Sequence, residues 1–240
     1  MFGLFGKSNA PHKCPIPVAS QKWIDTAFPF LAKLFGEEKI KNRKVLIPHI
    51  SDFPIRYDGE EKTAWDTLHI IAARMEVDPN DIVLDIYADA TAAVSTGSPL
   101  GTKVSLGSYE NPDNTDAYTG RQEDGKLHIL LEAQRLTDPE RMVAYLAHEI
   151  ARMRLMESPQ PEDDHRLADM TTMIFGLGIF NANASFYSPK RGYVLQREWG
   201  YALALFARLR GEKDPGWIKH LTPNIRSDFA KSQAYLDDRG

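Results

Sequence analysis

The hydrophobic positions in the first half of the chain change from helical to strand-like spacing. Apolar residues recur at helical intervals over residues 20–36 and 61–76, which predicts a helix in each segment. Shorter runs rich in β-forming residues predict strands over residues 44–48, 81–87 and 103–109.

The second half begins with a hairpin pattern and continues with helical patterns. Residues 118–121 and 126–131 flank Glu123-Asp124-Gly125, a turn sequence that predicts an antiparallel hairpin. Thr137-Asp138-Pro139-Glu140 then predicts a helix start by its capping chemistry, with Pro at an early helical position. Helical spacing follows over residues 139–156, 162–180, 195–210 and 225–236.

This order of elements predicts an α+β fold. A small antiparallel or mixed sheet would be preceded by helices and followed by a largely helical C-terminal half. Residues 1–19 are interpreted as an extended lead-in, and residues 20–240 as a single domain because no linker-like segment interrupts them.

Composition narrows the classes of protein to which the chain can belong. Of its 240 residues, 42% are hydrophobic and 26% charged, with a net charge of −4, as in ordinary globular proteins. The absence of a basic excess argues against a nucleic-acid partner, and no apolar run is long enough to predict a membrane partner. A start without a secretory pattern and a single cysteine, Cys14, favour a cytoplasmic protein.

One helix carries the motif that points to chemistry, His148-Glu149-Ile150-Ala151-Arg152. In H-E-x-x-H metallopeptidases, two His one helical turn apart hold Zn²⁺ on one face, and the intervening Glu is the general base. A third ligand, often a Glu, comes from a following helix, and an Asp four residues after it orients a metal-binding His.

The wider sequence resembles a group of uncharacterised bacterial zincin-like proteins. That group has an A-H-E-L-x-H helix, then a segment like E-P-L-T-D-L, then G-L-G-I-F-x-A-N. The corresponding residues are Ala147 to Arg152, Asp163 to Met170 and Phe175 to Asn183, and the later segments Gly200 to Phe206 and Trp217 to Arg226 also look like that group. The resemblance covers most of the chain and implies a zincin-like fold, with a twisted sheet beside the active helix.

This chain departs from the pattern at two ligand positions. Arg152 replaces the second His, and His165 replaces the Glu of the next helix, whereas His148, Glu149 and Asp169 are kept. Arg cannot be deprotonated near neutral pH, so it cannot bind zinc, and its charge would repel the ion.

Two interpretations of the altered site remain open. In the first, Arg152 forms an ionic network with Glu149, Asp169 and Asp164 in place of a metal, so no cofactor is bound. In the second, His148, His165 and Asp169 hold a metal, with zinc the first choice, and Glu149 is the catalytic base.

These interpretations lead to three function hypotheses. The first is a pseudoenzyme, a metallopeptidase-like protein without peptidase activity that uses the former cleft or another surface to bind a protein or peptide partner. The second is an active metal-dependent hydrolase, and the third is a bacterial interaction or immunity-type module. Tyr187 and Tyr193 follow the site in sequence and are interpreted as packing residues, with hydrogen bonding to a substrate carbonyl as the alternative.

Overall fold

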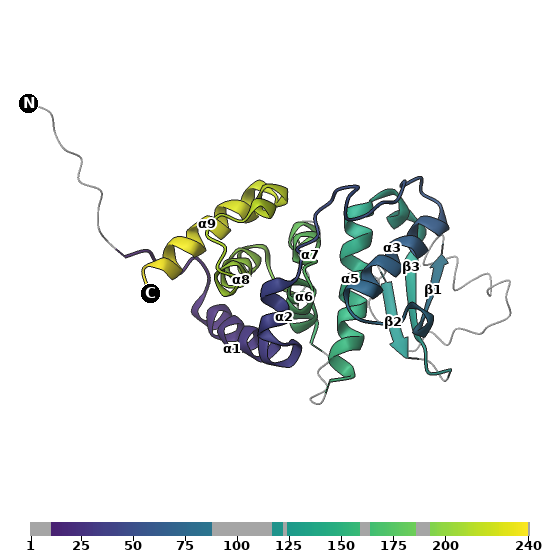
Figure 1. Ribbon diagram of the computed structural model, residues 1–240, viewed down its shortest axis with the longest axis horizontal. Coiled ribbons are helices and arrows are strands. Elements are labelled where there is room, and N and C mark those ends of the chain that lie inside the picture. The colour runs from purple at the N-terminus through teal and green to yellow at the C-terminus, as the bar shows by residue number, and fades with distance from the viewer. Residues whose placement is uncertain (1–10, 88–116, 122–123, 159–163, 186–192, 240) are drawn as a thin grey trace, which may run out of the picture.

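A computed structural model describes residues 11–87, 117–121, 124–158, 164–185 and 193–239, and combines α-helices with a small sheet (Figure 1). The described α-helices are α1 (Val18–Phe35), α2 (Glu37–Asn42), α3 (Glu61–Arg74), α5 (Pro139–Met156), α6 (His165–Ile174), α7 (Gly178–Ala184), α8 (Gln196–Leu209) and α9 (Pro223–Asp237). Short 3₁₀ turns lie at Pro79–Asp81, Ala133–Thr137 and Gly216–His220. This mixture of helices and strands agrees with the predicted α+β class.

The sheet contains β1 (Ile82–Tyr87), β2 (Ala117–Arg121) and β3 (Leu127–Glu132), in the order β1-β3-β2. β2 pairs antiparallel with β3, which confirms the predicted hairpin, whereas β1 pairs parallel with β3. A purely antiparallel sheet is therefore wrong, and the described sheet is mixed. A hairpin sequence identifies the partner of its own two strands, but it contains no information about the direction of a third strand.

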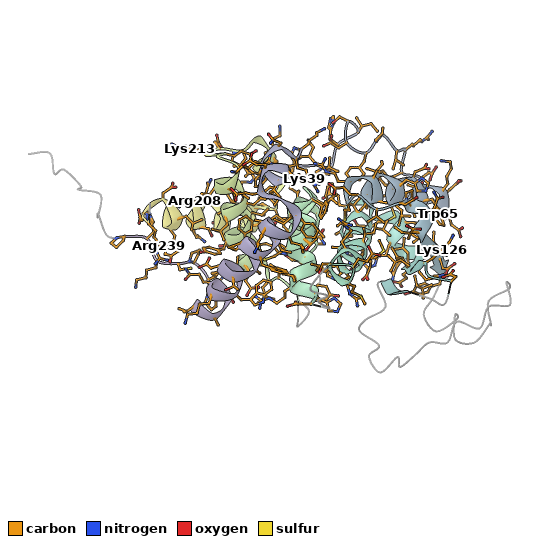
Figure 2. The ribbon with its side chains drawn as sticks, turned by 60° about the horizontal axis from the view of Figure 1, so that its bottom comes forward. Lys39, Trp65, Lys126, Arg208, Lys213 and Arg239 are labelled. Carbon is orange, nitrogen blue, oxygen red and sulfur yellow. The ribbon has the colours of Figure 1, made fainter. Side chains whose placement is uncertain are left out.

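Helix α5 lies in the middle of the molecule, between the sheet with α3 and the remaining helices (Figure 1). It contacts α3, α6, α7 and the strands β2 and β3. Figure 2 shows the same arrangement with side chains: Trp65 and Lys126 mark the sheet end, and Arg208 and Arg239 mark the helical end. Because both ends pack on α5, most of that helix is buried.

Alternating side chains of the strands explain how the sheet joins the core. On β3, Leu127, Ile129 and Leu131 are buried, while the residues between them are half-buried. On β1, Ile82 and Leu84 are buried in the same way. One face of the sheet therefore contributes to a hydrophobic core that is continuous with that of the helices.

Two of the predicted elements differ from the structure. Residues 44–48 form an irregular segment rather than a strand, and their one bond to a distant backbone joins Leu46 N–H to the Gly176 carbonyl, at 2.8 Å. The predicted helix over 162–180 is divided into α6 and α7. The predicted strand over 103–109 lies outside the described residues.

Gly176 causes the division between α6 and α7. Its φ of +82° is in the left-handed region, and a Cβ at this position would lie 2.5 Å from the Lys44 carbonyl oxygen. Only glycine fits there, because any side chain would collide with the backbone of the segment that α6 meets. Close packing, the role predicted for Gly176 and Gly178, is confirmed, since a Cβ on Gly178 would lie 2.9 Å from Met173.

Candidate functional site

Helix α5 places the motif residues in the interior of the molecule. The Asp138 side chain caps the helix by accepting from the N–H of Arg141 at 3.1 Å, as the sequence predicted. His148 and Glu149 are 4% and 5% exposed, so both side chains are removed from water. Arg152 lies one turn beyond His148, on the same side of the helix.

Asp169 of α6 forms hydrogen bonds both with His148 of α5 and with the backbone just before α8. Its Oδ1 accepts from His148 Nδ1 at 2.7 Å, and its Oδ2 accepts from the Val194 N–H, just before α8, at 3.0 Å. Asp169 is 5% exposed. Both carboxylate oxygens therefore have partners, which a buried charge requires.

His165, the first residue of α6, meets the other nitrogen of the His148 ring. His148 Nε2 lies 3.0 Å from His165 Nδ1. Tyr193 stacks against both imidazoles, with ring centroids 5.0 Å from His148 and 4.8 Å from His165. We call His148, His165, Asp169 and Tyr193, with the adjacent pair Glu149 and Arg152, the histidine site.

Burial and the neighbouring carboxylate of Asp169 act on the pKa of His148 in opposite directions. Burial by itself lowers the pKa of His148, but the charge and the hydrogen bond of Asp169 raise it, and the net direction is upward. Because Nδ1–H donates to Asp169, a neutral His148 accepts at Nε2 from His165, and a protonated one donates to it. The arrangement satisfies His148 in both protonation states.

Glu149 and Arg152 form the second pair of the histidine site. Arg152 Nη1 donates to Glu149 Oε2 at 3.2 Å, and its side chain is 18% exposed. Burial raises the pKa of Tyr193, and the charges of Glu149 and Asp169 raise it further, so this phenol stays protonated. Glu149, the residue expected to act as a general base, thus forms an ion pair with the guanidinium group of Arg152.

Asn181 of α7 fixes the part of α5 that precedes the motif. Its side-chain Nδ2 donates to the carbonyl oxygen of Ala144 at 3.0 Å, and Asn181 is 7% exposed. Ala144 lies one turn before His148, so this bond ties α7 to the backbone that positions the imidazole. This role of Asn181 could not be predicted from the sequence, because an Asn in a helix usually faces solvent.

The structure brings some of the predicted residues together and separates others. His148, His165 and Asp169 are adjacent, but Asp169 and His165 contact opposite nitrogens of the His148 ring. The ion pairs between described residues join Arg152 to Glu149, while Asp164 caps α6 by accepting from the N–H groups of Arg166 and Leu167. The expected network of Glu149, Arg152, Asp169 and Asp164 is thus divided into separate contacts.

These contacts are a poor fit to a zinc centre. Zinc is held by several imidazole, thiolate or carboxylate ligands, with outer-shell carboxylates orienting the imidazoles. Asp169 has the position of such an orienting group towards His148, and Arg152, which lies one turn from His148, cannot bind a metal. Within the described ranges, no group of three or more His, Cys, Asp or Glu side chains is arranged to hold a metal ion.

Comparisons with known proteins leave the predicted family untested. No protein-family model matches the chain, and neither curated proteins nor solved structures show a significant match to it. The zincin-like assignment therefore stays a prediction based on the motif residues. In the part of the chain that the structure describes, no helix is both long and apolar enough to cross a membrane.

Tyr193 was interpreted as a packing residue, and its ring does pack, stacked against the imidazoles of His148 and His165. The sequence does not predict this contact, because Tyr193 is far from His165 along the chain and the two residues are not on the same helix. Tyr187, predicted with it, lies outside the described residues.

Proposed function

We propose that the chain is a zincin-like pseudoenzyme, which does not hydrolyse peptides and uses its former active-site region to bind a peptide or protein partner. The observation that carries the proposal is the pair between Arg152 and Glu149, at 3.2 Å. A guanidinium bound to the would-be base neutralises the carboxylate and places a permanent positive charge where a zinc ligand belongs.

The retained acids support this proposal through charge balance. A buried carboxylate without a cation is costly, so loss of a metal would leave Glu149 uncompensated. Arg152 supplies that compensation. Asp169 keeps the orienting role that it would have towards a metal-binding imidazole, and it is satisfied without a metal by His148 and the backbone of Val194.

Peptide binding is supported by the strand nearest to α5 at the edge of the sheet. β2 pairs with β3 and with no other strand of the described sheet, so its second edge has backbone groups that an extended peptide can pair with. β2 also contacts α5, the helix of the histidine site. A peptide along this edge would therefore lie beside α5.

The absence of peptidase chemistry is tested by elemental analysis and by hydrolysis assays on the purified full chain. We expect far less zinc than one ion per chain, and no hydrolysis of a peptide library above that given by Glu149→Gln. Stoichiometric zinc together with hydrolysis that disappears in Glu149→Gln would contradict the proposal.

Binding is tested with peptides selected against the full chain from a random library. We expect His165→Ala and Tyr193→Ala to weaken binding, because both side chains lie at the centre of the histidine site. Binding that survives both changes would place the partner on another surface, as expected for an interaction or immunity-type module.

A second candidate function, the metal-dependent hydrolase, is favoured by one distance. His148 Nε2 and His165 Nδ1 are 3.0 Å apart, close enough for both nitrogens to bind one metal ion in place of their mutual hydrogen bond. In that function His165→Ala would release the bound metal. Asp169 would act as the orienting carboxylate rather than as a ligand, because it contacts the opposite nitrogen of His148.

Arg152→His tests whether one replaced residue accounts for the loss of zinc binding. If the fold is zincin-like, this variant should gain zinc affinity, measured by calorimetric titration with zinc alone. Arg154→His is the matched control, because it makes the same change two residues later, on the other side of α5. Equal behaviour of the two variants would show that the geometry of a zinc site is not retained.

A further inference from the structure

A second group of charged side chains lies on the side of α5 away from the histidine site. It contains Arg43 at the end of α2, Arg74 in the last turn of α3, Arg154 in the last turn of α5 and Arg210 at the end of α8. We call these four residues the arginine cluster. They come from distant parts of the sequence and meet because all four helices end in the same region.

Phe175 is the point on which the arginine cluster converges. The Arg43 guanidinium carbon lies 4.3 Å from the centre of the Phe175 ring, and that of Arg154 lies 6.0 Å from it. Arg74 Nε donates to the Phe175 carbonyl oxygen at 2.9 Å. Three guanidinium groups from three helices thus surround one residue at the end of α6.

Helix ends account for part of this positive charge. Arg210 Nη1 donates to the carbonyl oxygens of Ile40 and Arg43 at the end of α2, at 2.6 and 2.7 Å. Arg74 does the same at the end of α6. Cations are favourable at the C-terminal ends of helices, where carbonyl groups lack partners. Arg43 and Arg154 make no such bond in the part of the chain that the structure describes.

Carboxylates balance only some of the remaining charge. Glu76 pairs with Arg43 at 2.6 Å, and Glu212 pairs with Arg210 at 2.8 Å. Asp52 attracts Arg74, but Asp52 already forms an ion pair with Lys44. Between described residues, Arg74 and Arg154 have no carboxylate partner of their own.

Several donors of the arginine cluster are buried without a hydrogen-bond partner in the described structure. They are Arg43 Nη1, Arg74 Nη2 and Arg154 Nε. The Arg43 side chain is only 9% exposed, so water cannot satisfy most of it. Buried polar groups almost always have partners, and charged donors are the costliest to leave without one.

The arginines also repel one another. Burial lowers the pKa of Arg43, and the charge of Arg154 lowers it further. Burial likewise lowers the pKa of Arg74, with Arg43 and Arg210 adding to the effect. An anion between these groups would remove the repulsion and supply the missing acceptors together.

We propose that the arginine cluster binds a small oxyanion of the phosphate type through Arg43, Arg74 and Arg154. The unpartnered donors belong to arginines of three helices that meet around Phe175, and a tetrahedral oxyanion has enough acceptor oxygens for all three. Arginine is well adapted to phosphate because its donors form a rigid fork. Glu76, which is 45% exposed, is the internal carboxylate that such an anion would compete with for Arg43.

The proposal is tested by calorimetric titration of the full chain with inorganic phosphate at constant ionic strength, with chloride as the reference salt. Arg154→Met should weaken phosphate binding about tenfold or more, since it removes one charged donor. Arg197→Met is the matched control: Arg197 is exposed and outside the cluster, so this variant should bind phosphate like the wild type. Glu76→Gln should bind it more tightly, because the competing carboxylate is gone.

Thermal unfolding separates binding from a structural role. Without phosphate, Arg154→Met should be as stable as the wild type or more so, because Arg43 loses a repulsive neighbour. With phosphate, the wild type should gain more in unfolding temperature than Arg154→Met. Phosphate that acts no differently from chloride, or equal losses in Arg154→Met and Arg197→Met, would overturn the proposal.

Discussion

The two sides of α5 differ in how completely their buried charges are paired. On the side of the histidine site, Asp169 is joined to His148 and Glu149 to Arg152, so each buried acid has a cation or donor. On the side of the arginine cluster, guanidinium groups outnumber the carboxylates that contact them. The difference shows that a site whose charges are paired needs no further partner, whereas an excess of one sign indicates a group still to be bound.

The largest effect on the free energy of unfolding is expected from replacing Asp169 of the histidine site. Asp169→Ala removes the partner of His148 and the acceptor of the Val194 N–H, both in a buried place. We expect a loss of roughly 3 to 5 kcal/mol in the free energy of unfolding, measured with denaturant. Asp164→Ala, which removes only a helix cap of α6, should cost about 1 kcal/mol. Similar losses for the two variants would contradict the central role of Asp169.

The next effect concerns the backbone beside the arginine cluster. Gly176→Ala forces a left-handed φ on alanine and places its Cβ 2.5 Å from the Lys44 carbonyl oxygen. The expected cost is about 2 kcal/mol or more in the free energy of unfolding. Gly211→Ala is the control: its φ is +68°, but its Cβ would meet no described atom within 4 Å. It should cost about half as much.

A double-mutant cycle sharpens the comparison at Glu149 and Arg152. Glu149→Gln and Arg152→Met should each destabilise the protein, and the double variant should lose less than the sum. The coupling between the two side chains should be about 1 kcal/mol, because Arg152 is partly exposed and solvent screens the pair. A coupling near zero would show that Arg152 does not compensate the buried charge of Glu149.

The smallest expected effect is a pH dependence of the unfolding free energy that comes from His148 in the histidine site. Because the pKa of His148 is raised in the folded protein, protonated His148 stabilises the fold most below its ordinary pKa of about 6.5. This stabilisation is lost as the pH rises through the folded-state value. The difference in unfolding free energy between the wild type and His148→Gln should therefore shrink with rising pH. A difference that grows with pH would be the opposite of this expectation.

Local sequence signals predicted most elements of the fold. The helix over 139–156 begins and ends as predicted, because Asp138 and Pro139 mark its start and its apolar face is continuous. The hairpin of β2 and β3 followed from its turn residues. The break between α6 and α7 was missed, since the close approach of Lys44 to Gly176 is a contact between distant segments.

The candidate site was predictable in its members and less so in its contacts. The resemblance to the metallopeptidase pattern singled out His148, Glu149, Arg152, His165 and Asp169, and the structure brings these residues together on α5 and α6. Spacing could not reveal that Asp169 and His165 contact opposite sides of one ring, because that depends on how α6 is rotated. The arginine cluster was not predicted at all, as its members are far apart in sequence and no motif connects them.

The hydrogen bond from the Val194 N–H to Asp169 offers a direct way to observe the histidine site. This amide is outside regular helix, yet its proton is held by a buried carboxylate that also holds His148, 21 residues away from Asp169 in sequence. Exchange of that proton with solvent requires α6, α5 or the start of α8 to separate locally. The exchange rate of one amide therefore reports how often the whole site opens.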